Sequence, residues 1–365
     1  MPALPSLPSL LRRVPLDPYI AALLGTVLLA ALLPARGAAA SAVDGISTGA
    51  VALLFFLYGA RLSTREAVAG LRHWRLHLTV LACTFAVFPL LGLAARGLVP
   101  HVLTPGLYTG LLFLCLVPST VQSSIAFTSV ARGNVPAAIC AGTYSTLVGI
   151  VLTPLLAALL LGRSGGGVSA DSLLSVVLRL LVPFVAGQLT RRWLAGPLAR
   201  HRSALGLVDR GSILLVVYAA FSAGMTRGVW HQVTPWQLCA LVVVEGALLA
   251  LMLTLTTHGA RRLGFSRGDR IALTFAGSKK SLAGGLPMAT VLFGAQASLA
   301  VLPLMLFHQM QLMVGAVLAK HFARQQERLE RPEVSDRQGQ GQGQEQEQEQ
   351  GQDRPAAADL VQRKA

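Results

Sequence analysis

Ten apolar stretches, each about as long as a bilayer is thick, leave this sequence few alternatives to a membrane protein. A hydrocarbon core of about 30 Å takes roughly 20 apolar residues in a helix, and a backbone in lipid must satisfy its own hydrogen bonds. The sequence therefore predicts an all-α polytopic membrane protein with about ten transmembrane helices. The predicted spans are 19–35, 43–60, 77–99, 107–131, 135–161, 172–190, 209–226, 236–258, 270–293 and 297–319.

The distribution of charge agrees with a chain in lipid. Only 13% of the 365 residues are charged, against about a quarter in soluble domains, and nine of the sixteen acidic residues follow residue 326. The net charge of +15 comes from arginines in short clusters between the apolar stretches. Because no separate basic domain is present, we expect no nucleic-acid partner.

The arginines also predict the orientation, since basic residues accumulate in cytoplasmic loops. With the N-terminus inside, the inner loops hold fourteen arginines and the outer loops hold four, namely Arg36, Arg96, Arg163 and Arg227. We expect both termini in the cytoplasm and an even number of spans. High alanine, leucine and arginine usage hints at a bacterial genome, and hence at a bacterial inner membrane.

Three regions follow from this organisation. Residues 1–18 form a cytoplasmic N-terminal segment, 19–322 the ten-helix domain, and 323–365 a Gln/Glu-rich cytoplasmic tail expected to be disordered. Ten spans divide into 19–161 and 172–322, and five spans per half place the second half upside down relative to the first. Inverted repeats of this kind build many secondary transporters.

The fourth and ninth spans both carry helix breakers followed by polar residues, which is where such transporters bind substrates and ions. In the fourth, Pro118 precedes Ser119, Thr120, Gln122, Ser123, Ser124 and Thr128. In the ninth, the middle holds Gly277, Ser278, Lys279, Lys280, Ser281, Gly284, Gly285 and Pro287. Single prolines and serines are ordinary in membrane helices, but matching clusters at the same helix of each half favour a site.

Two of the four lysines, Lys279 and Lys280, are adjacent near the middle of a predicted span. A charge there costs roughly 2.5 to 3.5 kcal/mol on insertion scales. Snorkelling is the alternative, although it works near helix ends. Adjacent helical residues point about 100° apart, so a break is needed for both to face one site. Glu245 is the natural counter-ion, with Arg179 a competitor for that carboxylate.

Three stretches carry a resemblance to a known family. They are PSTVQSSIAFTSVARGNVPAAICAGTYSTLVGIVLTPLL (Pro118 to Leu156), GSKKSLAGGLPMATVLF (Gly277 to Phe293) and LPLMLFHQMQLMVGAVLA (Leu302 to Ala319). The chain resembles the bile acid:sodium symporter superfamily over about 15–322, in the SBF-like branch typified by the seventh member of human solute carrier family ten. The resemblance implies a core domain in which helices 4 and 9 cross at their breaks, beside a panel domain.

The resemblance also places sodium ligands near Ser123 and Ser124, with further hydroxyls expected around Ala137 and Ala141, close to Thr143 and Ser145. Typical sodium-dependent members carry a glutamate, glutamine and asparagine pattern in the ninth helix. This chain has Thr274, Ser278 and Lys279 instead. An ammonium group removes oxygen ligands and repels sodium, so sodium coupling is doubtful.

The leading hypothesis is secondary transport of a small organic anion by hydroxyls, half-helix N-termini and a lysine. In a variant, a buried lysine exchanges a proton during the cycle, so the coupling ion is H⁺ or Na⁺. The alternative is a non-transporting regulator or scaffold that acts through its tail. Enzyme motifs are absent from the spans, and we expect neither an enzyme nor a cofactor. The candidate binding residues are Gln122, Ser123, Ser124, Thr143, Glu245, Thr274, Ser278, Lys279, Lys280 and Ser281.

Overall fold

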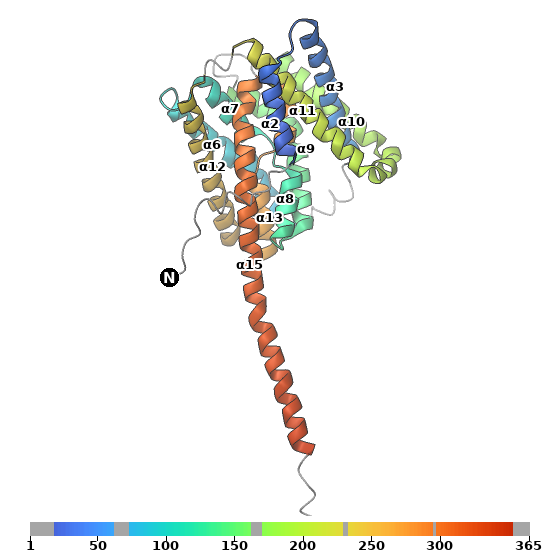
Figure 1. Cartoon of the computed structure of the whole chain (residues 1–365), viewed down its shortest axis with the longest axis vertical. Coiled ribbons are helices and arrows are strands. Elements are labelled where there is room, and N and C mark those ends of the chain that lie inside the picture. Colours follow the sequence, from blue (N-terminus) through green and yellow to red (C-terminus); the bar gives the residue numbers. More distant parts are fainter. Residues whose placement is uncertain (1–17, 62–72, 162–169, 229–232, 295–296, 353–365) are drawn as a thin grey trace, which may run out of the picture.

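The structure is a computed structural model that describes residues 18–61, 73–161, 170–228, 233–294 and 297–352. Every regular element within these ranges is helical. The predicted N-terminal segment, apart from residue 18, lies outside the described residues. Figure 1 shows the helices as a bundle in which α15 runs along the body and continues well beyond it.

The first half of the described chain contains straight helices, one irregular helix and one broken helix. The elements are α2 (Pro18–Leu32), α3 (Ala38–Arg61), α5 (Trp74–Ala82), the π-helical turn η2 (Cys83–Val87), α6 (Phe88–Ala94), the 3₁₀ turn η3 (Ala95–Leu98), α7 (Pro105–Leu116), α8 (Val121–Val130) and α9 (Val135–Leu161).

The second half contains a second broken helix. Its elements are α10 (Ala170–Arg200), α11 (Arg202–Thr226), α12 (Pro235–Arg262), α13 (Arg267–Gly277), α14 (Leu282–Phe293) and α15 (Ala297–Gln352).

Several helices are long and apolar enough to cross a membrane. Among the described residues six qualify, and a seventh is added if α7 and α8, bent by 63°, count as one span. The prediction of an all-helical, multi-pass membrane protein is therefore confirmed. The number ten and the inverted repeat are not tested by this count, because it covers the described residues alone.

Glycine lets α3 and α10 lie unusually close together, side by side in Figure 1. A Cβ atom on Gly59 would lie 2.0 Å from the carbonyl oxygen of Phe184, and one on Gly187 would lie 2.0 Å from that of Phe56. Any side chain at either position would force the backbones apart. The pair thus forms one tight unit beside the broken helices.

The tail differs from the expectation of disorder, since α15 continues as a helix to Gln352. Glutamine, glutamate and arginine are good helix formers, and a helix that is already nucleated extends at little cost. The GQGQGQEQEQEQGQ stretch still has no apolar residue to bury. Its lack of independent folding therefore stays a prediction, and 353–365 lie outside the described residues.

Candidate functional site at two broken helices

The two breaks touch each other directly. Helix α7 stops before Pro118, which has no amide hydrogen to continue the ladder, and α13 stops at Gly277. The Ser281 amide donates a hydrogen bond to the Pro118 carbonyl at 2.8 Å. Ser281 then caps α14 by accepting from the Gly284 amide at 3.0 Å. Two breaks that are far apart in sequence thus meet inside the bundle.

Lys280 fills a cage of backbone carbonyls at this meeting point. Its side chain is fully buried, and Nζ donates to the carbonyl oxygens of Thr84 at 2.9 Å, Cys115 at 2.8 Å and Val117 at 2.9 Å. The nitrogen also lies 4.2 Å from the centre of the Phe88 ring. An ammonium group has three N–H donors, so all of them are satisfied.

Two of the three carbonyls, those of Thr84 and Cys115, are available because local sequence leaves them without amide donors. In the π-helical turn the Phe88 amide bonds back to the Cys83 carbonyl, and the next residue, Pro89, has no N–H to offer Thr84. At the end of α7 the Ser119 amide donates instead to Ser145 Oγ at 2.8 Å. Sequence analysis missed the role of Pro89, although a proline in an apolar run was a visible signal.

Gln311 on α15 holds the second break in place. The Lys280 amide donates to Gln311 Oε1 at 2.8 Å, and Gln311 Nε2 donates to the Lys280 carbonyl at 2.7 Å. A side-chain amide thereby supplies the donor and acceptor that the interrupted helix lacks. Gln311 lies in a stretch that carries the family resemblance, but it was not among the predicted site residues.

Lys279 points to a different element from Lys280. It is 2% exposed, and Nζ lies 3.3 Å from the Ser123 carbonyl oxygen, 3.6 Å from the centre of the Phe127 ring and 5.1 Å from that of Phe275. Carbonyl and aromatic faces both attract a cation. Neither lysine reaches the surface of this structure, so burial replaces the snorkelling alternative.

Several predicted hydroxyls join the two breaks to each other. Ser124 Oγ donates to the Phe275 carbonyl at 3.1 Å, and Ser119 Oγ donates to that of Ala276 at 2.5 Å. Ser278 Oγ donates to the Thr274 carbonyl at 2.6 Å. These bonds satisfy the last carbonyls of α13. The hydroxyl protons of Ser124 and Ser278 are therefore donated to the protein backbone.

Two further positions concern the sodium pattern. The Ser123 hydroxyl oxygen is buried and lacks a hydrogen-bond partner in the described part of the chain. Ala137 and Ala141, where the resemblance implies hydroxyls, are buried in an apolar cluster. Thr274 Oγ1 lies 3.4 Å from Thr257 Oγ1. Few of the oxygen ligands expected for sodium are therefore present here. The Lys279 nitrogen also lies close to Ser123, one of the expected ligands.

Glu245 does not pair with either lysine. Its side chain is fully buried in α12, and both carboxyl oxygens lack a hydrogen-bond partner among the described residues. Lys280 already has three carbonyl partners, and Lys279 lies against α8. The expected Glu245 counter-ion contact is therefore absent from the arrangement of the described residues.

A cavity of about 240 Å³ opens beside the crossing. The N-termini of α8 and α14 both reach it, and the Thr120 side chain does not cap α8. Unpaired amides at a helix N-terminus attract anions. Three predicted residues, Gln122, Thr143 and Ser281, line this cavity, whereas neither lysine does. The remaining lining residues are Tyr58, Arg61, Pro118, Thr120, Val121, Thr146, Leu147, Phe184, Asp209, Ala283 and Gly284.

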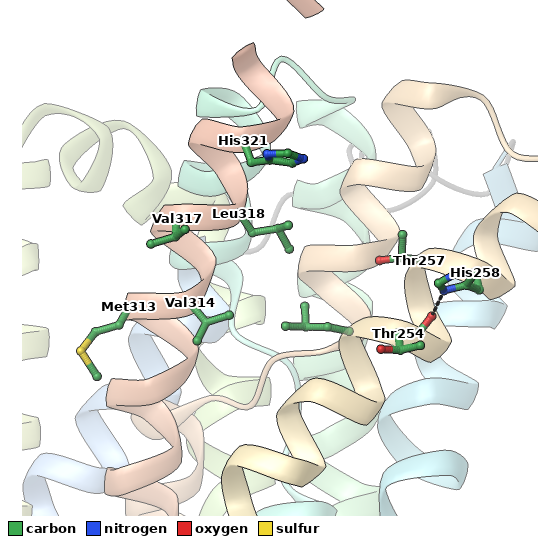
Figure 2. Close-up of a pocket in the computed structure, with 9 residues that line it drawn as sticks. Thr254, Thr257, His258, Met313, Val314, Val317, Leu318 and His321 are labelled. Atoms are coloured by element: carbon green, nitrogen blue, oxygen red, sulfur yellow. Dashed lines mark hydrogen bonds between the residues drawn. The ribbon is translucent and has the colours of Figure 1, made fainter. Parts of the chain in front are cut away.

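A larger hollow lies elsewhere, between α12 and α15 (Figure 2). Its lining is mostly apolar, and Val317 and Met313 in it are 71% and 54% exposed. His258 there bonds to the Thr254 carbonyl of its own helix at 3.0 Å. It contains none of the predicted binding residues, and its exposed apolar side chains are typical of a surface that faces lipid.

Comparison with known proteins shows the family of this chain. The model of the SBF-like CPA transporter family matches residues 17–324. The chain belongs to the SBF-like CPA transporter family. An uncharacterized protein of Pseudomonas aeruginosa is 55% identical over 314 residues, covering 85% of this chain and 94% of that protein.

Other members of this family have names that describe transport. YfeH of Escherichia coli, named as a putative symporter, is 47% identical over 321 residues, covering 88% of this chain and 97% of the relative. Sodium/bile acid cotransporter 7 of Rattus norvegicus is 30% identical over 277 residues, covering 75% of this chain and 82% of the relative. The resemblance and the expectation of a transporter, not an enzyme, are confirmed.

Proposed function

We propose that the protein is a secondary active transporter that moves a small organic anion by alternating access through the cavity beside the broken helices. The observation that carries the proposal is the convergence of the α8 and α14 N-termini on one cavity. Both helix dipoles point their positive ends at it. A cavity of about 240 Å³ suits a small solute.

The proposal includes an architecture of ten spans in two inverted five-helix repeats. The α7 and α8 pair and the α13 and α14 pair serve as the broken fourth and ninth helices, and the Ser281 to Pro118 hydrogen bond supports their crossing. Helices α2, α3, α10 and α11 form the panel against which the core moves. The protein resides in the bacterial inner membrane with both termini in the cytoplasm, as the arginine distribution favours.

Lys280 replaces a coupling cation in this mechanism. Its nitrogen has three carbonyl partners and an aromatic face, as an alkali cation in a backbone site would. One relative's name mentions sodium, but here the positive charge is part of the chain. Classical sodium coupling is therefore not expected, and proton coupling is the form consistent with a buried amine.

Uptake into proteoliposomes tests this function. Radiolabelled acetate, pyruvate, succinate and isethionate are offered under a sodium gradient, a proton gradient or neither. We expect uptake of at least one of them without sodium stimulation. The isosteric cavity variant Thr143→Val should reduce uptake several-fold, while Thr79→Val, on α5 and outside the cavity lining, should not.

Two results would contradict the proposal. Absence of uptake for all four anions would reject transport of a small organic anion, and strict dependence on sodium would reject replacement of the cation by Lys280.

A further inference from the structure

An ion pair also lines this cavity. Arg61 at the end of α3 and Asp209 on α11 both line the cavity, with Nη1 and Oδ2 2.5 Å apart. Their side chains are 30% and 10% exposed. The helix N-termini that attract anions belong to α8 and α14. The ion pair belongs instead to α3 and α11, two helices of the proposed panel.

The pair leaves bonding capacity on both partners. It uses a single Arg61 nitrogen, although a guanidinium has five N–H donors arranged to grip a carboxylate with two at once. Asp209 Oδ1 is buried and has no hydrogen-bond partner among the described residues. A purely structural pair would be expected to satisfy that oxygen as well.

Among the described residues, Arg61 is also the cationic side chain that lines the cavity. Lys279 and Lys280 contact backbone carbonyls outside the lining, whereas Arg61 borders the free volume within reach of a solute. A planar guanidinium suits carboxylate or sulfonate better than an ammonium does. Recognition of the anion's charge therefore falls to Arg61, beside the two helix ends.

We propose that the substrate's carboxylate or sulfonate takes Arg61 away from Asp209, so that the Arg61–Asp209 pair is the charge-selective element of the cavity. This inference rests on the proposed function and adds the residue that recognises the substrate. In the empty carrier Asp209 neutralises Arg61, which avoids leaving a lone charge in a poorly hydrated place. Substrate and Asp209 thus compete for one guanidinium.

Reaction of a cysteine inside the cavity tests the exchange without knowledge of the natural substrate. Thr146 lines the cavity, and its hydroxyl donates within its own helix, to the Gly142 carbonyl, so Thr146→Cys introduces a thiol with little disturbance. Cys239, the exposed native cysteine, is changed to alanine. The probes are two thiosulfonate reagents of similar size, one ending in a sulfonate and one in a trimethylammonium group.

The readout is the ratio of the sulfonate rate to the trimethylammonium rate. Asp209→Asn frees Arg61 and should raise this ratio about tenfold, and Arg61→Gln should lower it about tenfold. The double variant should return to the parent ratio. After labelling, the tethered sulfonate should raise the melting temperature of the parent and of Asp209→Asn, but not that of Arg61→Gln, because only the first two retain its partner.

Two outcomes overturn the inference. One is an unchanged rate ratio in Asp209→Asn, and the other is a tethered sulfonate that stabilises Arg61→Gln as well as the parent. A substitution that disrupts the fold would change the rates of both reagents in the same direction. Comparison with the trimethylammonium rate therefore separates misfolding from charge selection. Labelling requires no transport, so failed uptake with a positive labelling result would reject the proposed function and leave charge selection by this pair standing.

Discussion

Lys280 is a structural element of the site as well as the proposed replacement for an ion. Its nitrogen joins the π-helical turn, the end of α7 and the start of α14 through three carbonyl bonds. Each buried carbonyl left without a donor costs about 1 to 3 kcal/mol. The residue therefore contributes to stability whether or not the protein is transporting.

Truncation of this side chain gives a prediction at the residue scale. Lys280→Ala should lower the melting temperature markedly, and methylammonium or sodium at high concentration should restore part of the loss by entering the vacated cage. Lys279→Ala is the matched control and should show no such rescue, because its nitrogen has a single carbonyl partner. Thermal unfolding with choline chloride as the reference salt measures both. Equal rescue of the two variants would contradict the caged-cation interpretation.

The sequence indicated which residues matter here more readily than what they do. The depth of the lysine pair, the proline at position 118 and the hydroxyls after it are visible as anomalies in apolar stretches. The partners of Lys280 are backbone atoms, which have no sequence signature beyond Pro89 and Pro118. Arg61 and Asp209 lie at the ends of predicted spans and give no sign of a site in the sequence, because only folding brings residues 148 positions apart to one cavity.

At the scale of elements, the bundle combines interrupted helices with one pair packed at backbone distance. The interrupted helices expose amides and carbonyls that bind other groups, while α3 and α10 have glycines where their backbones meet. Two tightly fitted helices move as a body, and movement between such bodies is the usual basis of alternating access.

The α3 and α10 contact yields a prediction with a control on the same helix. Gly59→Ala places a Cβ atom against the Phe184 carbonyl and should destabilise the protein by roughly 1 to 3 kcal/mol, as overpacking does. Gly49→Ala, also on α3, meets nothing within 4 Å and should leave stability unchanged or slightly higher. Comparison of melting temperatures in one detergent checks both. Equal stability of the two variants would mean that the helices separate freely.

At the scale of the molecule, we expect the transporter and the tail to be separable. The family match ends at residue 324, and a described ion pair near the start of the tail joins Arg132 to Glu327 at 3.5 Å. Both side chains are about half exposed, so this pair contributes little. Beyond it, α15 continues away from the bundle (Figure 1).

Removal of the tail tests that separation. A chain ending at Arg328 keeps the Arg132–Glu327 pair and all of the residues that match the family. It should take up anions at the parent rate and unfold at nearly the parent temperature. Uptake in proteoliposomes and thermal unfolding are the measurements. Lost cellular function with unchanged uptake would favour the alternative hypothesis, in which the protein is a regulator or scaffold that binds a partner through its tail.

The carbonyl cage around Lys280 has a thermodynamic consequence for the whole transport cycle. A bound ion that is picked up on one side and released on the other carries the work of its gradient into the cycle. An ammonium group fixed to the chain returns to its starting position after every turnover, so as long as it keeps its proton, neither concentration nor membrane potential does net work on it. The force for accumulation must then come from a coupled proton, and without one the solute moves only down its own electrochemical gradient.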